Sequence, residues 1–444
     1  MIKLHNTYFI ILLACFMPLS ASFSMSFSDR SVEYSLPNGL KVVLIQDKRS
    51  PVVVSSIWYK VGSSYERDGI TGISHILEHL MFKGTKNINP GEFSRKIKKI
   101  GGSENAFTGR DFTGYYQKVH KDYLELCLKL ESDRMRNLVF RDDEVRKELD
   151  VVKEERRLRT DDQPISKVFE KIGKQVFGMT GYGIPIIGSM DDISNTTINN
   201  LKEWYKNHYN PNNAIIIIAG DIEFQDTKKL VEKYYAKIEN RKSTQMVIPI
   251  NHKPSFDDII MTDKVSQPII LMSYKHEPFS ETNKKEMYAL ELLFELMDGS
   301  NSSRFTRNLI EKKKIAISTF ISYDTYSARD NLITFGGSPR MGISPETFKD
   351  EMLSEFENFV ESGLNDGELD KVKSRLLAGN IYKFDSVFYQ VMQVGMLETK
   401  NYNWELLDSY ITDINSINEN DLKNIAKKVI LNKKYLYSLI EPQS

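Results

Sequence analysis

Apolar residues along the chain follow two periodicities, one typical of strands and one typical of helices. Residues 52–60 and 214–219 form nearly continuous apolar runs of strand length, whereas residues 73–80 repeat apolar side chains at helical spacing. In the first half the pattern predicts strands at 35–45, with a turn at Asn38-Gly39, and at 52–60, 113–119 and 214–219. It predicts helices near 71–82, 90–101, 121–138, 141–160, 164–177 and 197–208.

The second half repeats this arrangement. Residues 289–297 match the apolar pattern of residues 73–81 without a gap, and the pairs 57–60 with 272–275 and 201–219 with 422–440 have nearly the same offset. One common offset indicates an internal duplication. In the second copy we expect strands near 256–262, 267–275, 315–325 and 330–338, and helices near 281–298, 302–311, 345–362, 366–381, 386–397 and 418–430.

These elements predict an α+β fold of two homologous domains, each a mixed sheet packed with helices. We expect the domains at 30–240 and 255–444, joined by a linker at 239–256 that has no sustained periodicity. The formal net charge is zero and basic residues form no stripe. This balance argues against nucleic acid and against electrostatic docking to a membrane.

Residues 1–24 have the pattern of a secretory signal peptide. Lys3 precedes an apolar run at 8–19, and small residues follow it. The run is too short for an ordinary transmembrane helix, so we expect no integral span in the mature chain and export to a bacterial periplasm. A lipid anchor at Cys15 is the less favoured alternative. Removal of the signal leaves Cys127 as a single thiol, which excludes an intramolecular disulfide.

The stretch that carries chemistry is Gly72–Phe82, which contains the order H-x-x-E-H. His75 and His79 stand four residues apart and therefore project from one side of the expected helix, where two imidazoles can share one metal ion. Glu78 projects close to the same side and suits a carboxylate that takes a proton from an attacking water. This order is the inverted form of the H-E-x-x-H motif.

A catalytic zinc usually has three protein ligands, so we expect a third ligand elsewhere. The candidates are Glu148, Glu154 and Glu155, in a charged segment with helical periodicity. Glu148 and Glu155 are seven residues apart and lie on one face, so one could bind the metal while the other supports a ligand. Taken alone, the segment is more typical of a charged, solvated helix.

These motifs resemble the pitrilysin, insulysin and mitochondrial processing peptidase family of zinc metallopeptidases. The matching segments are Gly-Ile-Ser-His-Ile-Leu-Glu-His-Leu-Met-Phe-Lys-Gly-Thr at 72–85, Asn-Ala-Phe-Thr at 105–108, Val-Val-Lys-Glu-Glu at 151–155, Tyr-Gly at 182–183 and Tyr-Asn-Pro-Asn-Asn at 209–213. The resemblance covers nearly the whole mature chain. It implies two curved halves that face each other around a chamber, of which this chain would form one half.

The resemblance also implies roles for individual residues. His75, His79 and Glu155 would bind one Zn²⁺ per chain, and Glu78 would be the general base. Glu148 would support the site from behind the ligands. An extended peptide would pair with an edge strand that contains Asn105, Ala106 and Phe107, as in strand-addition recognition.

The second half departs from the family pattern at two positions. Family members that are complete in one polypeptide carry an Arg and, seven residues later, a Tyr, which hold the substrate carbonyl and the developing oxyanion. Here Ile310 and Ile317 occupy those positions, and an isoleucine side chain donates no hydrogen bond. We therefore expect a homologous partner subunit without zinc that supplies the pair in a heterodimer, or else a homodimer. The alternative is that Arg304 or Arg307 substitutes within this chain.

Two functions remain open on the sequence. The first is a zinc-dependent endopeptidase subunit that hydrolyses extended peptides. The second is a binding or scaffold subunit without catalysis. The intact set of His75, Glu78, His79 and Glu155 favours the enzyme, because a scaffold has no need of all four.

Overall fold

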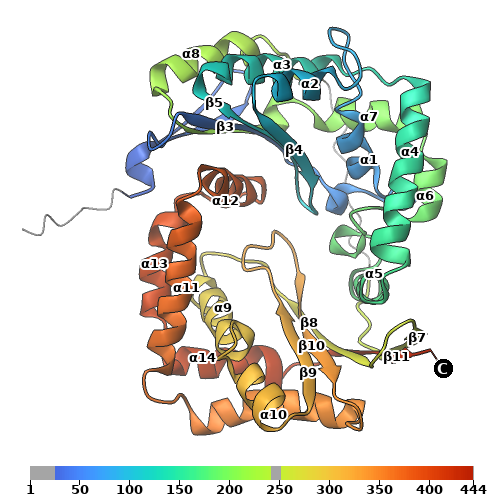
Figure 1. Ribbon diagram of the computed structural model, residues 1–444, viewed down its shortest axis with the longest axis vertical. Helices are drawn as coiled ribbons and strands as arrows, with labels where there is room; N and C mark the ends of the chain where they lie inside the picture. The colour runs from blue at the N-terminus through green and yellow to red at the C-terminus, as the bar shows by residue number, and fades with distance from the viewer. Residues whose placement is uncertain (1–25, 242–251, 444) are drawn as a thin grey trace, which may run out of the picture.

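The computed structural model describes residues 26–241 and 252–443, which form two mixed sheets with helices packed on them (Figure 1). The first sheet has six strands in the order β1-β2-β6-β3-β5-β4, and only the pair β2/β6 is parallel. Its strands are β1 (Ser31–Ser35), β2 (Lys41–Gln46), β3 (Val52–Tyr59), β4 (Ser103–Thr108), β5 (Thr113–His120) and β6 (Ala214–Gly220). Strand β4 lies at the edge of the sheet.

The second sheet has five strands in the order β7-β11-β8-β10-β9, with β7/β11 as its parallel pair. Its strands are β7 (Ile259–Asp263), β8 (Ile269–His276), β9 (Ala316–Ser322), β10 (Asn331–Pro339) and β11 (Leu436–Pro442). The order β2-β6-β3-β5-β4 of the first sheet recurs here strand for strand. The edge strand β9 is therefore the counterpart of β4.

Helices follow the strands in the same order in both halves. The first half contains α1 (Ile73–Leu80), α2 (Glu92–Lys99), α3 (Leu124–Asn137), α4 (Asp142–Arg156), α5 (Pro164–Phe177), α6 (Met190–Asn195), α7 (Ile198–His208) and α8 (Phe224–Tyr235). The second half contains α9 (Lys284–Asp298), α10 (Pro345–Ser362), α11 (Glu368–Phe384), α12 (Val387–Thr399), α13 (Leu406–Ser416) and α14 (Glu419–Ala426). The two halves thus share one topology, as the common sequence offset predicts.

One helix of each half packs on the sheet of the other half. Val391 and Val394 of α12 are fully buried in a cluster with residues of β2, β3 and β6. Val168 and Ile172 of α5 are fully buried in a cluster with residues of β7, β8 and β11. In Figure 1, α12 lies beneath the first sheet and α5 lies above the second. The surfaces of α12 and α5 and the sheet faces that they cover are apolar, so their mutual burial joins the two halves.

The elements differ from the sequence prediction in three ways. The predicted turn at Asn38-Gly39 is present, with φ +85° at Gly39, and folds β1 and β2 into a hairpin, but the first strand of the hairpin starts at Ser31, before the predicted range of 35–45. Helices α6, α8 and α13 were not predicted. The helices predicted at 141–160, 302–311 and 418–430 contain π-helical segments.

The expected signal peptide and Cys15 lie outside the described residues. Within residues 26–241 and 252–443, none of the helices combines the length and the apolar character that crossing a bilayer requires. Cys127 is a free, fully buried thiol in α3, where it fills space in the first core.

The contact of α12 with the first sheet yields a stability prediction. A Cβ added at Gly395 would lie 2.1 Å from Cε2 of the fully buried Trp58, whereas a Cβ at Gly379 of α11 would meet no atom within 4 Å. We expect Gly395→Ala to lower the free energy of unfolding by about 1–3 kcal/mol through overpacking. Gly379→Ala should raise it by about 0.5–1 kcal/mol through helix propensity. Denaturant unfolding measures the change in unfolding free energy of each variant. Equal changes for Gly395→Ala and Gly379→Ala would contradict the described contact between Gly395 and Trp58.

Candidate metal centre and peptide cleft

Helix α1 presents three polar side chains because its other faces are buried. Ile73, Ile76, Leu77 and Leu80 are at most 2% exposed and pack into the first core. His75, Glu78 and His79 remain on the side that lines a cavity. The H-x-x-E-H spacing therefore places both imidazoles and the carboxylate at one wall, as the sequence predicts.

The start of α1 is held by a buried carboxylate. Glu66, which is 1% exposed, accepts the backbone N–H groups of Gly72 at 2.6 Å and Ser74 at 2.8 Å. Gly72 has φ +83°, and a Cβ there would lie 2.4 Å from the carbonyl oxygen of Ile187. Burial raises the pKa of Glu66 to about 8, although both backbone hydrogen bonds oppose this shift. These contacts fix the helix directly before His75.

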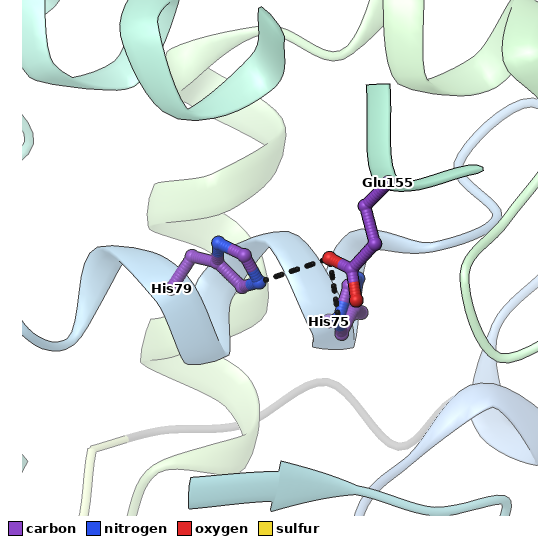
Figure 2. A group of neighbouring side chains, drawn as sticks. All are labelled: His75, His79 and Glu155. Atoms are coloured by element: carbon purple, nitrogen blue, oxygen red, sulfur yellow. Dashed lines mark ion pairs between the residues drawn. The ribbon is translucent and has the colours of Figure 1, made fainter. Parts of the chain in front are cut away.

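Glu155 of α4 brings the third candidate ligand to the two histidines (Figure 2). Its Oε2 atom lies 3.6 Å from Nε2 of His75 and 3.5 Å from Nε2 of His79. One ligand atom from each of the three residues lies within 4.8 Å of the others. Two ligands about 2.1 Å from a tetrahedral zinc ion lie about 3.4 Å apart. The observed separations therefore fit a shared Zn²⁺ and are too long for hydrogen bonds.

Protonation of the two imidazoles differs. Burial, with the neighbouring His79 and Arg159, lowers the pKa of His75 to about 3, so its ring is neutral, as a metal ligand must be. Burial also disfavours the imidazolium of His79, but the hydrogen bond with Glu148 and the nearby carboxylates outweigh it and raise its pKa. A cation held between these groups would take the place of that proton.

Glu148 contacts the side of His79 that faces away from Glu155, and it precedes Glu155 by two helical turns. Its Oε2 atom lies 3.1 Å from Nδ1 of His79, and its Oε1 atom lies 2.5 Å from Nζ of Lys83. Burial raises the pKa of Glu148, but the hydrogen bonds with His79 and Lys83 outweigh it, so the net shift is downward. An ionised carboxylate at Nδ1 orients the ring so that Nε2 faces Glu155.

Glu78 is not part of the metal-ligand group. The hydroxyl of Thr108, at the end of β4, donates to its Oε2 atom at 2.5 Å. Burial raises the pKa of the Glu78 carboxyl, while this hydrogen bond opposes the shift. The carboxylate is thus held beside the ligands, where it can accept a proton.

The cavity has a volume of about 1190 Å³ and is bounded on one side by β4. Asn105, Ala106 and Phe107 all line it. The N–H of Ala106 is bonded at 2.9 Å to the side chain of Asn105. Since β4 is an edge strand, its outer backbone groups can pair with an added strand. The remaining lining comes mainly from α4, α5 and residues 182–187.

Other residues singled out in the sequence lie away from the cavity lining. Ile310 lies against the second core, and Ile317 is 51% exposed on β9. Arg304 is buried, forms an ion pair with Glu368 at 2.7 Å and donates to the Gly363 carbonyl oxygen at 2.9 Å. Arg307 lies 3.6 Å from the same Glu368 carboxylate. Neither arginine is among the residues that line the cavity.

Sequence reasoning missed several residues that hold this site. Lys83 follows His79 by four residues, but this spacing is only a weak signal of a contact near Glu148, because α1 ends at Leu80. Glu66 and Thr108 carry no such signal, because only the fold brings their loop and strand to α1. Glu154, the third candidate from the sequence, instead pairs with Arg157 at 2.8 Å.

Three features occur together here: a helix with H-x-x-E-H, a carboxylate from a second helix, and an open strand edge beside a large cavity. They define the class of zinc proteases with the inverted motif. The chain belongs to peptidase family M16, the insulinase family. Residues 41–190 match the family described as "Insulinase (Peptidase family M16)", and residues 195–376 match "Peptidase M16 inactive domain".

Relatives extend over most of the chain. The "Zinc protease PqqE" of Helicobacter pylori is 31% identical over 370 residues, which are 82% of this chain and 82% of that protein. The crystal structure of a protease from Helicobacter pylori has a TM-score of 0.85 at 28% identity and covers 93% of this chain and 99% of its own. A "peptidase M16 inactive domain" structure from Pseudomonas fluorescens has a TM-score of 0.83 at 16% identity, with 93% and 98% coverage, and shows the fold alone.

The buried Glu66 gives a prediction about pH. Its pKa of about 8 in the folded state exceeds the ordinary value of 4.5, so the folded state binds the proton more tightly. Its contribution to stability is complete below about pH 4.5 and is lost as the pH rises to about 8. We expect the metal-free chain to lose unfolding free energy of the order of a few kcal/mol over this range.

In Glu66→Gln that loss should be absent, whereas Glu203→Gln, at an exposed position of α7, should retain it. Urea unfolding at pH 5 and pH 8 in the presence of a chelator measures the difference. The same pH dependence in Glu66→Gln and in the unmodified chain would show that Glu66 does not cause it.

Proposed function

We propose that this chain is the zinc-bearing subunit of an endopeptidase that hydrolyses extended peptides. The observation that carries the proposal is the convergence of His75, His79 and Glu155 beside a large cavity with an open strand edge. His75, His79 and Glu155 would hold one Zn²⁺. The names of the family and of its relatives, which include zinc proteases, support this assignment.

A zinc ion held there supplies a Lewis acid that polarises the scissile carbonyl and makes a nearby water more acidic. Glu78 accepts the proton of the attacking water and passes it to the leaving amine. The hydrogen bond from Thr108 keeps the Glu78 carboxylate in place for both transfers. Burial raises the pKa of Glu78, which favours a carboxyl group that can both accept and donate a proton.

Glu148 acts through His79 and is a positioning residue. It accepts from Nδ1 of His79 and is itself held by Lys83. This chain of contacts fixes which imidazole nitrogen faces the metal position. The Glu148 carboxylate also places negative charge next to the His79 ring, on the side away from the metal position.

Peptide would bind as an added strand along β4. The backbone of Asn105, Ala106 and Phe107 provides the pairing groups. Entry of the peptide would displace the Asn105 side chain from the Ala106 N–H. Main-chain pairing gives affinity for extended segments without selecting a sequence.

The missing Arg and Tyr would come from a homologous partner subunit without zinc. In the described residues, the cavity lining comes from residues 75–187 alone, so the second half contributes no donor. Loss of a positioned oxyanion donor costs roughly a hundred-fold or more in rate. A heterodimer in the periplasm is therefore proposed, with a homodimer and a lipid anchor at Cys15 as the less supported forms.

The zinc ligands are tested by a pair of adjacent substitutions. Glu155→Gln removes the proposed ligand and should reduce the bound zinc to well below one ion per chain. Glu154→Gln should retain zinc, because that carboxylate is paired with Arg157 and does not face the histidines. Elemental analysis after dialysis measures both, and equal zinc contents would refute the role of Glu155.

Catalysis is tested with fluorogenic peptides, first on the chain alone and then after mixing with the homologous chain. We expect activity mainly on mixing, and Glu78→Gln to reduce it by a factor of about 10²–10⁴ with zinc still bound. Full activity of the chain alone would remove the need for a partner. Bound zinc without hydrolysis in either condition would support the binding or scaffold subunit instead.

A further inference from the structure

Arg110 lies at the end of the peptide cleft nearest the general base. It belongs to the turn that follows β4 and lines the same cavity as His75, Glu78 and His79. Thr108, whose hydroxyl contacts Glu78, precedes it by two residues, a Cα separation of at most about 7 Å. An arginine side chain at this position therefore reaches a peptide paired with β4.

Existing contacts orient the guanidinium of Arg110 without neutralising it. Its Cζ atom lies 5.0 Å from the ring centroid of Tyr182, and one N–H donates a long hydrogen bond of 3.3 Å to Asn331. Within the described chain, no carboxylate oxygen lies at ion-pair distance from it, although the charges of Asp111 and Asp324 are near enough to act on its pKa. The side chain is exposed to the cavity, and the protein around it partly removes water and lowers its pKa. Most of its five N–H donors remain available.

The other charges on the cavity wall already have partners. Glu154 pairs with Arg157 at 2.8 Å, and Glu170 pairs with Arg156 at 2.9 Å. Glu155 pairs through its second oxygen with Arg159 at 2.7 Å.

The carboxylate next to Arg110 in sequence is also occupied. Asp111 is 2% exposed and accepts the hydroxyls of Ser64, at 3.0 Å, and Tyr182. Arg329 lies 3.9 Å from it and balances its charge. Asp111 is therefore directed into the protein, and Arg110 is left as a cation on the wall without an ionic partner.

We propose that Arg110 determines substrate preference by binding the carboxylate of an acidic side chain close to the cleaved bond. This proposal rests on the proposed peptidase function. Arginine presents a planar fork of donors that matches a carboxylate, and the ring of Tyr182 restrains that fork. The preferred substrate class is thus an extended peptide with an Asp or Glu side chain at one position near the scissile bond.

The test measures binding separately from hydrolysis. Zinc-loaded chain carrying Glu78→Gln is titrated with fluorescein-labelled decapeptides that differ only by Glu, Gln or Lys at one position, which is scanned along the peptide. At one position Glu should bind roughly tenfold more tightly than Gln, the size expected of one charge-assisted hydrogen bond in place of a neutral one. Lys at that position should bind more weakly than Gln.

Variants then assign the preference to Arg110. Arg110→Gln should abolish the discrimination, and Arg110→Glu should reverse it in favour of Lys. Arg110→Lys, which keeps the charge, should retain part of the preference and controls for loss of folding. Arg95→Glu makes the same charge change on the exposed face of α2 and should leave the preference unchanged.

Equal binding of the Glu, Gln and Lys peptides at every position would overturn the role of Arg110 and leave the peptidase function intact. A Glu preference that persists in Arg110→Gln would also overturn it. If no peptide of any sequence binds, either to this chain alone or after mixing with the homologous chain, the cavity does not hold peptides, and the proposed function fails together with the role of Arg110.

Discussion

The metal centre depends on a helix that is too short to be stable alone. Helix α1 has eight residues, and isolated helices shorter than about 12–15 residues are marginal in water. Its position is therefore set entirely by tertiary contacts: its apolar face is fully buried, Glu66 binds its first N–H groups, and α4 packs across it. Because Glu148 and Glu155 lie on α4, the contact that fixes the helix also delivers the carboxylates to His75 and His79.

The cleft combines a general mode of peptide recognition with local charge. On the proposed function, the outer edge of β4 would pair with peptide backbone without selecting side chains. Most charges on the wall already have partners inside the protein. Selectivity is consequently left to a few groups, of which Arg110 is the cation without an ionic partner. Among the described residues, those that line this cavity all come from the first half, so in the proposed heterodimer the groups that hold the reacting carbonyl would come from the second chain.

Much of this could be predicted from the sequence, and the reasons for the remainder are physical. Periodicity located the long helices and strands, and the offset between 73–81 and 289–297 indicated the repeat, which the matching strand orders confirm. His75, Glu78 and His79 are local in sequence and could be grouped by spacing alone. The choice of Glu155 over Glu154 depends on how α4 is rotated against α1, which an amphipathic pattern does not define. Thr108 reaches Glu78 through sheet topology, a contact without any sequence signal.

The exchange of α5 and α12 has an evolutionary consequence. Each helix covers an apolar sheet face that belongs to the other half, so neither half can be deleted without exposing a hydrophobic surface. The second copy carries Glu291 and Glu295 at the positions that match His75 and His79, so the histidine pair is absent from those two positions. It has nevertheless been retained, since α5, which forms part of the cleft wall, rests on its sheet. The cleft wall thus depends on a domain whose described residues form no group of metal ligands like that of the first half.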